Sequence, residues 1–128
     1  MEIQFRELKL KNHVVLNAFS KNGVRLGEVR CSYRGYISNF RVYPAFRKNG
    51  VGRQILSHLI YNEALPSRLW LHAKAGESPK YQEKLESLYA SLGFNKKGTV
   101  PQGTIMVLNR ADLVKAVIVA HFTNSYEG

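Results

Sequence analysis

The chain has 128 residues, 45% of them hydrophobic, and a formal net charge of +10 at pH 7. This length predicts one domain, residues 1–128, with enough apolar residues for a core, and no apolar run is long enough to span a membrane. The single cysteine, Cys31, excludes an internal disulfide, and four scattered histidines without ligand spacing argue against a metal site. With no signal-peptide pattern at the N-terminus, we expect a cytoplasmic protein with neither a metal nor a membrane partner.

Alternating apolar residues in the first third of the chain predict an antiparallel meander of four strands. The predicted strands cover residues 3–10, 14–20, 24–34 and 36–43. A short break at 11–13 separates the first two, and the Lys-Asn-Gly run at 21–23 is typical of a hairpin turn. Gly27, inside the third strand, indicates a bulge.

The rest of the chain alternates between helices and strands. Apolar residues in two adjacent i, i+4 rows predict a helix over 50–64, which Pro66 ends. A second helix is predicted over 80–92, with Gly93 as its C-terminal cap. Its apolar face consists of Tyr81, Leu85, Leu88 and Leu92. The remaining predicted elements are strands 68–73, 94–100 and 104–109 and a C-terminal helix over 112–122. This order predicts an α+β fold with a mixed, mostly antiparallel twisted sheet and two core helices.

The most informative segment is residues 42–53, Val-Tyr-Pro-Ala-Phe-Arg-Lys-Asn-Gly-Val-Gly-Arg, which joins the fourth strand to the first helix. Unpaired N–H groups and the positive end of the dipole make a helix N-terminus an anion site. Gly50 and Gly52 lack a Cβ, so that a ligand can approach the backbone. The spacing fits neither a P-loop nor a dinucleotide-binding fold, and we interpret it as a pyrophosphate site.

Arg47-x-x-Gly50-x-Gly52 after a strand ending in Val-x-Pro resembles the acyl-CoA-binding motif of the GNAT N-acetyltransferase superfamily. Two later segments are similar to the same family: Leu-Tyr-Ala-Ser-Leu-Gly-Phe at 88–94 and the Met-containing strand at 104–108. The resemblance covers residues 24–109, about two-thirds of the chain. It implies a GNAT-like fold and an acyltransferase that uses acetyl-CoA as cosubstrate and needs no metal.

The resemblance also implies site residues. Tyr89 matches the family's tyrosine and would protonate the leaving thiolate as general acid, although by its position alone it would be a core tyrosine. The backbone near Val42 would polarise the thioester carbonyl, and Gln82 stands where the family has an asparagine. The implied coenzyme-binding residues are Phe40, Arg41, Val42, Arg47, Lys48, Asn49, Gly50, Val51, Gly52, Arg53 and Gln82.

Two departures from the family concern the acceptor. Residues 11–13 stand where the family usually has helices that wall the acceptor side. We therefore expect an open site and a large acceptor such as a protein amine. Alternatively, a second copy of the chain in a homodimer would rebuild the missing wall. No Asp or Glu occurs over 36–43, and Tyr36 stands where some members have a glutamate. The general base therefore stays open between Glu28 and His72, and a water relay or an amine that arrives neutral would need no dedicated base.

The positive charge is concentrated in the first half. Residues 1–53 hold 11 Lys or Arg against 3 Glu, whereas residues 54–128 hold 8 against 6 acidic residues. A basic half favours polyanions, so weak nucleic-acid binding is expected. The alternative to the enzyme is a non-catalytic GNAT-fold module that docks a basic surface, with Arg25, Arg30, Arg34 and Arg41, on nucleic acid or an acidic protein.

Overall fold

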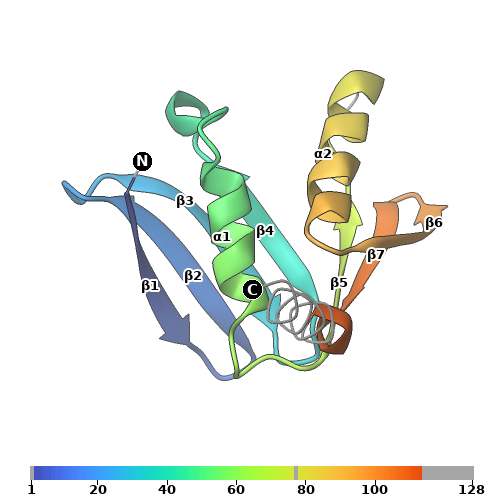
Figure 1. Cartoon of the computed structure of the whole chain (residues 1–128), viewed down its shortest axis with the longest axis horizontal. Helices are drawn as coiled ribbons and strands as arrows, with labels where there is room; N and C mark the ends of the chain where they lie inside the picture. The colour runs from blue at the N-terminus through green and yellow to red at the C-terminus, as the bar shows by residue number, and fades with distance from the viewer. Residues whose placement is uncertain (1, 77, 114–128) are drawn as a thin grey trace, which may run out of the picture.

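The computed structural model describes residues 2–76 and 78–113. They form two sheets with two helices on one side (Figure 1). The first sheet is an antiparallel meander of four strands: β1 (Ile3–Lys9), β2 (His13–Ser20), β3 (Arg25–Ser32) and β4 (Ile37–Val42). The second has the order β5-β7-β6, with β5 (Arg68–Ala73), β6 (Asn95–Val100) and β7 (Gly103–Asn109), again antiparallel. The predicted meander and the final hairpin are confirmed.

Two helices connect these strands. A 3₁₀ turn, η1 (Pro44–Phe46), leads from β4 to α1 (Val51–Ile60), and α2 (Pro79–Ser91) follows β5. α1 ends four residues before the predicted boundary. Residues 110–113 are helical, and the rest of the helix predicted over 112–122 lies outside the described residues. Within 2–76 and 78–113, no helix has the length and apolar character to cross a membrane.

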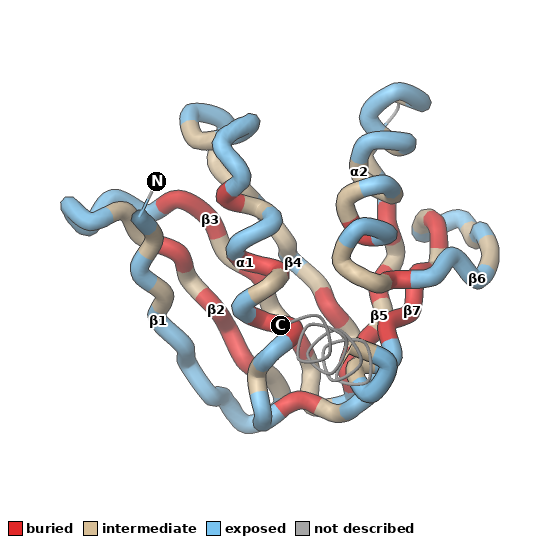
Figure 2. Tube along the Cα trace, viewed as in Figure 1, coloured by how far each residue is buried: buried red, intermediate tan, exposed pale blue. Residues whose placement is uncertain are grey.

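The core lies between α1 and the first sheet and continues along the helix-facing side of the second sheet (Figure 2). The fully buried side chains come from one face of each helix and strand, as the spacing of the apolar residues along each element predicts. They include Leu16, Leu26, Ile55, Leu56, Leu59, Leu69, Leu71, Met106 and Leu108. The helix predicted over 80–92 is confirmed as α2, and Leu85, Leu88 and Leu92 of its predicted apolar face pack, partly buried, against the core. Tyr81 departs from that prediction, because it is 61% exposed, and Tyr89 is the one buried residue of α2 among those described. α2 packs on a narrow strip because the side facing α1 borders an open groove.

The two sheets meet at a single described point. Tyr36 and Trp70 form an isolated parallel bridge, with the Trp70 N–H donating to the Gly35 carbonyl over 2.9 Å. From this point β4 and β5 diverge (Figure 1). The edge of β4 that faces β5 therefore has no partner strand among the described residues.

Two bulges shape the first sheet. The β2–β3 register shifts directly beside Gly27, next to the predicted position. The second bulge lies in β4, where the pairing passes from Arg30–Ser38 to Glu28–Arg41, and Asn39 has a φ of 51°. Positive φ is uncommon outside glycine, and asparagine is among the residues that tolerate it best. A bulge bends its strand and redirects its side chains, here next to the gap between the sheets.

We expect Gly27→Ala to destabilise the protein by about 3 kcal/mol, the upper part of the range for overpacking. A Cβ at Gly27 would overlap the carbonyl oxygen of Arg41 and lie 3.1 Å from Cδ1 of Ile55, so that either β4 or α1 must move. Gly98→Ala is the matched control, because a Cβ there meets no atom within 4 Å. Urea unfolding of both variants is the measurement, and equal stabilities would contradict this account of the β3–β4–α1 contact.

Candidate active site

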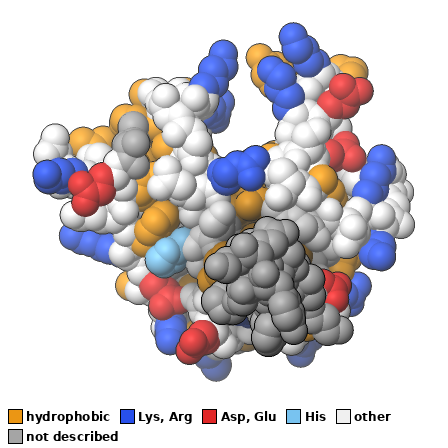
Figure 3. Space-filling view, viewed as in Figure 1, with side chains coloured by type: hydrophobic (Ala, Val, Ile, Leu, Met, Phe, Trp, Pro, Cys, Tyr) orange, Lys and Arg blue, Asp and Glu red, His pale blue; other side chains and the backbone are white. Residues whose placement is uncertain are grey.

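A groove of about 1250 Å³ separates α1 from α2. Figure 3 shows it as a notch between two masses, with Lys and Arg side chains on both rims. Its walls come from β4, the loop before α1, the end of β5 and one side of α2. The lining residues are Phe40, Arg41, Val42, Pro44, Phe46, Arg47, Lys48, Gly50, Val51, Gly52, Arg53, Lys74, Ala75, Tyr81, Lys84, Leu85 and Leu88. Nine of the predicted coenzyme-binding residues are among them, whereas Asn49 and Gln82 are not.

The loop before α1 forms one end of the groove. Lys48 and Gly50 have φ angles of 70° and 76°, and Gly50 is the N-cap of α1. In the described chain, the N–H groups of residues 48–53 have no hydrogen-bond acceptor. Arg47 donates from Nε to the carbonyl of Val42 over 2.9 Å, which ties the loop to β4. Unpaired N–H groups, the helix dipole and three cationic side chains make this end of the groove suited to a polyanion.

The two glycines of the loop have different roles. A Cβ at Gly52 would lie 3.0 Å from Cζ of Phe40 and 3.4 Å from Cγ2 of Val42, so Gly52 lets α1 approach β4 closely. A Cβ at Gly50 would meet no atom within 4 Å, and its positive φ is what favours glycine there. Both glycines line the groove, but Gly50 borders open space, whereas Gly52 is also required for the packing of α1 on β4.

Tyr89, the predicted general acid, lies behind the groove. Its ring is 6.2 Å from that of Phe40, a lining residue, and 5.7 Å from that of Phe94. The side chain is 5% exposed, and its hydroxyl has no hydrogen-bond partner among the described residues. Burial raises the pKa of Tyr89 above its ordinary value of 10.0, so the phenol stays protonated at neutral and moderately alkaline pH.

The two candidate bases have different surroundings. Glu28 forms a salt bridge with Arg25, with 2.6 Å between the two side chains. His72 lies beside the bridge that joins the sheets, and its Nδ1 is 3.0 Å from the hydroxyl of Tyr36. The Trp70 ring packs against both, at 4.5 Å from Tyr36 and 5.6 Å from His72. The sequence showed Tyr36 only as the residue that stands where some family members have a glutamate. Its contact with His72 depends on the meeting of the two sheets, which the sequence pattern does not show.

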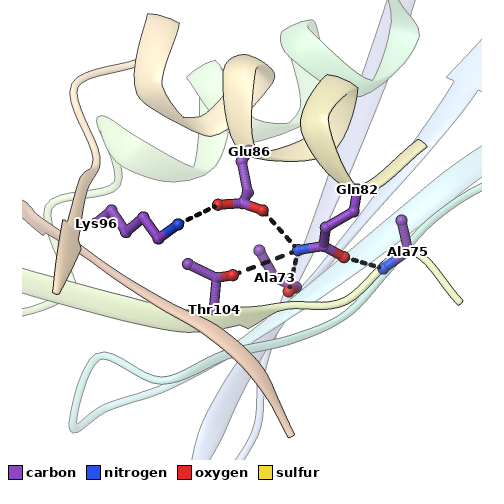
Figure 4. Close-up of polar contacts among 6 residues, drawn as sticks. All are labelled: Ala73, Ala75, Gln82, Glu86, Lys96 and Thr104. Atoms are coloured by element: carbon purple, nitrogen blue, oxygen red, sulfur yellow. Dashed lines mark hydrogen bonds and ion pairs between the residues drawn. The ribbon is translucent and has the colours of Figure 1, made fainter. Parts of the chain in front are cut away.

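Gln82 connects α2 to the end of β5 (Figure 4). Its side-chain oxygen accepts from the N–H of Ala75 at 2.9 Å, and its Nε2 donates to the Ala73 carbonyl at 2.8 Å and to Glu86 at 2.9 Å. The hydrogen bond from Gln82 lowers the pKa of Glu86 below its ordinary 4.5, and Lys96 acts in the same direction. These bonds occupy the amide, so Gln82 holds the groove wall without lining it.

Sequence reasoning missed the wall opposite the loop, which consists of Lys74 and Ala75 after β5 and of Tyr81, Lys84, Leu85 and Leu88 on α2. The i, i+3, i+4, i+7 spacing of the last four indicates a common helix face. Nothing in that spacing tells whether a face meets the core or a groove. The presence of the charged residue Lys84 in this set was the sign in the sequence that the face is solvated. In the structure its ammonium lies 5.8 Å from the Tyr81 ring centre.

Comparison with solved structures gives matches across most of the chain. The spermidine/spermine N-acetyltransferase SpeG from Vibrio cholerae matches with a TM-score of 0.68 at 12% identity, over 83% of this chain and 72% of SpeG. A GNAT-family acetyltransferase from Staphylococcus aureus Mu50 matches with 0.61 at 12%, over 77% and 68%. The PaiA N-acetyltransferase from Thermoplasma acidophilum, in complex with coenzyme A, matches with 0.60 at 16%, over 77% and 61%.

These similarities show that the chain has the GNAT fold, as its motifs predicted. No protein-family model matches the chain, and no curated protein matches it either. Among the described residues, no group of three or more His, Cys, Asp or Glu could hold a metal ion.

We expect Gln82→Met to destabilise the protein by about 1–3 kcal/mol, because the Ala75 N–H and the Ala73 carbonyl lose their partner. Methionine keeps the length of the side chain and a good helix propensity. Glu86→Gln is the comparison: it removes the partly exposed ion pair with Lys96, which is worth about 1 kcal/mol or less, and keeps a side-chain oxygen that can still accept from Gln82. Thermal and urea unfolding measure both, and a Gln82→Met variant no weaker than Glu86→Gln would show that the connection is dispensable.

Proposed function

We propose that this protein is an acetyl-CoA-dependent N-acetyltransferase that acts on a primary amine of a large acceptor. The groove supports this most directly: an anion-binding loop at one end leads along the free edge of β4 to the gap between the sheets. The fold match to PaiA, whose structure contains coenzyme A, agrees with it. In the described chain no helix stands between β1 and β2, which leaves room for a macromolecular acceptor.

The residues present fit a coenzyme. A pyrophosphate needs several donors and positive charge, and the loop supplies the N–H groups of residues 48–53 with Arg47, Lys48 and Arg53. The edge of β4 over 40–42 has no partner strand among the described residues, although Arg47 already donates to the Val42 carbonyl. The rest of this edge fits the amides of the pantetheine arm, which would pair with it as an added strand. Lys74 and Lys84 add positive charge on the opposite wall.

Acetyl-CoA would supply the acetyl thioester. The amine nitrogen forms a bond to the acyl carbon, the carbon–sulfur bond breaks, and the sulfur takes a proton. Tyr89 is the proposed donor of that proton, because burial keeps its phenol neutral and its hydroxyl has no other described partner. A backbone N–H near Val42 would polarise the thioester carbonyl.

The amine must lose a proton before or during this step. We infer that His72 is the better candidate for accepting it, because Glu28 is already held by the guanidinium of Arg25. Only Nδ1 of His72 has a described partner, the Tyr36 hydroxyl, so the ring keeps a second nitrogen for proton transfer. A water relay to the same ring would serve equally.

Gly50→Asp should weaken acetyl-CoA binding at least about 30-fold, ~2 kcal/mol, relative to Gly50→Asn. Both residues tolerate a positive φ and have the same shape, but only aspartate places a negative charge beside the pyrophosphate site. Calorimetric titration with acetyl-CoA measures the difference, and circular dichroism checks that both variants fold. Equal affinities for the two variants would reject the loop as the phosphate site.

Tyr89→Phe should lower kcat about 10²–10⁴-fold with little change in coenzyme affinity, the range for loss of a general acid. Tyr81→Phe is the matched control: it removes a hydroxyl from an exposed, groove-lining tyrosine of the same helix. Because burial raises the pKa of Tyr89, its hydroxyl should not cause any loss of activity up to about pH 10.

Turnover is measured as release of coenzyme thiol with a thiol reagent. The protein does not interfere, because Cys31 is buried and burial raises its pKa from 9.0 to about 12. If Tyr89→Phe retains the activity of Tyr81→Phe, then Tyr89 is only a packing residue.

A further inference from the structure

The face of the sheets opposite α1 and α2 carries a connected group of side chains beside the gap. On β5, Leu69 and Leu71 are buried beneath the helices, so Trp70 and His72 project from the opposite face. On β4, Ile37 is buried, which places Tyr36 and Ser38 on that same face. We call it the open face, because both described helices lie on the other side (Figure 1).

Arg30 adds a positive charge to the open face. It lies on β3 directly across from Ser38, and Tyr36 lies across from Ser32, two residues further along. Such diagonal neighbours are within reach of a long side chain. The Nε atom of Arg30 is buried without a hydrogen-bond partner among the described residues. No ion pair to Arg30 is found in that part of the chain, so its charge is uncompensated there.

Negative charge is almost absent around the gap. Across β2–β5 and β7 the sole acidic residue is Glu28. Its carboxylate is 2.6 Å from Arg25 and is therefore neutralised within the sheet. A polycation that approached the gap from the open face would meet Arg30 and no available carboxylate. An anionic group that approached from the same side would be attracted by Arg30 and would meet no free carboxylate that repels it.

We propose that the acceptor is a primary amine with a carboxylate close to it, which binds on the open face with its carboxylate toward Arg30 and its amine toward the Tyr36–His72 pair. This chemistry occurs in a lysine of an acidic peptide segment, which agrees with the large acceptor of the proposed function, and also in a free amino acid, which the test below separates from it. The proposal rests on the proposed function. It separates this chain from SpeG, whose named substrates, spermidine and spermine, are polycations.

The test compares acceptors in the thiol-release assay at low ionic strength. The acceptors are a lysine peptide flanked by glutamates, the same peptide flanked by arginines, spermidine, and free glutamate. We expect kcat/KM for the glutamate-flanked peptide to exceed that for the arginine-flanked peptide and for spermidine at least tenfold, about 1.4 kcal/mol. The advantage should shrink as salt is added, because exposed charges are screened. Free glutamate against the acidic peptide distinguishes the two sources of the carboxylate.

Variants assign the preference to Arg30. Arg30→Gln should remove most of the tenfold preference, whereas Arg30→Lys, which keeps the charge, should retain it. Lys9→Gln is the matched control: it makes the same change in net charge at an exposed residue of β1, on the side of Ile3 and Phe5, which pack against the core. If Arg30→Gln fails to fold, the Arg30→Lys result and the salt dependence of the wild-type preference still decide the proposal.

Faster turnover of spermidine or of the arginine-flanked peptide would overturn the proposal and leave the acetyltransferase function intact. Binding of acetyl-CoA without turnover of any acceptor would instead overturn the proposed function. In that case calorimetric titration of the two peptides onto the coenzyme-loaded protein decides the acceptor proposal: tighter binding of the acidic peptide supports it, and equal or reversed affinities reject it.

Discussion

The arrangement of the site depends on how closely two sheets approach at one point and how quickly they separate beyond it. Gly35 makes the approach possible: with a φ of 94°, it accepts the Trp70 N–H, and a Cβ there would overlap the carbonyl oxygen of Arg68. Past Tyr36, no described hydrogen bond joins β4 to β5. A continuous sheet would leave no free strand edge for a ligand and no passage between its faces.

Helix α1 is held on β4 by the same kind of close approach. Because Gly27 has no Cβ, β4 and the Ile55 side chain of α1 can approach the backbone of β3 closely. In the same way, Gly52 lets the first turn of α1 contact Phe40. The helix N-terminus is therefore fixed at the end of the free strand edge, where its dipole and unpaired N–H groups can act on a bound anion. The position of the proposed anion site relative to the gap therefore depends on packing, and the loop residues alone do not determine it.

Much of the fold follows from local patterns in the sequence. Alternation and helical spacing predict each described strand and helix to within a few residues, because each buries one face and repeats with its own period. The β4 bulge, the contact of Tyr36 with His72 and the exposure of Tyr81 were not predictable in this way. Each depends on which elements lie opposite, and the period of one element carries no information about its neighbour.

The basic first half of the chain now divides between two faces. Arg47, Lys48 and Arg53 border the groove on the helix side, where a coenzyme would bring its own negative charge. Arg30 lies on the open face, which a coenzyme bound in the groove would not cover. The Nε atom of Arg30 is buried without a hydrogen-bond partner among the described residues, and a buried polar group without a partner costs stability. That cost is offset if a second anion, carried by the acceptor, binds there.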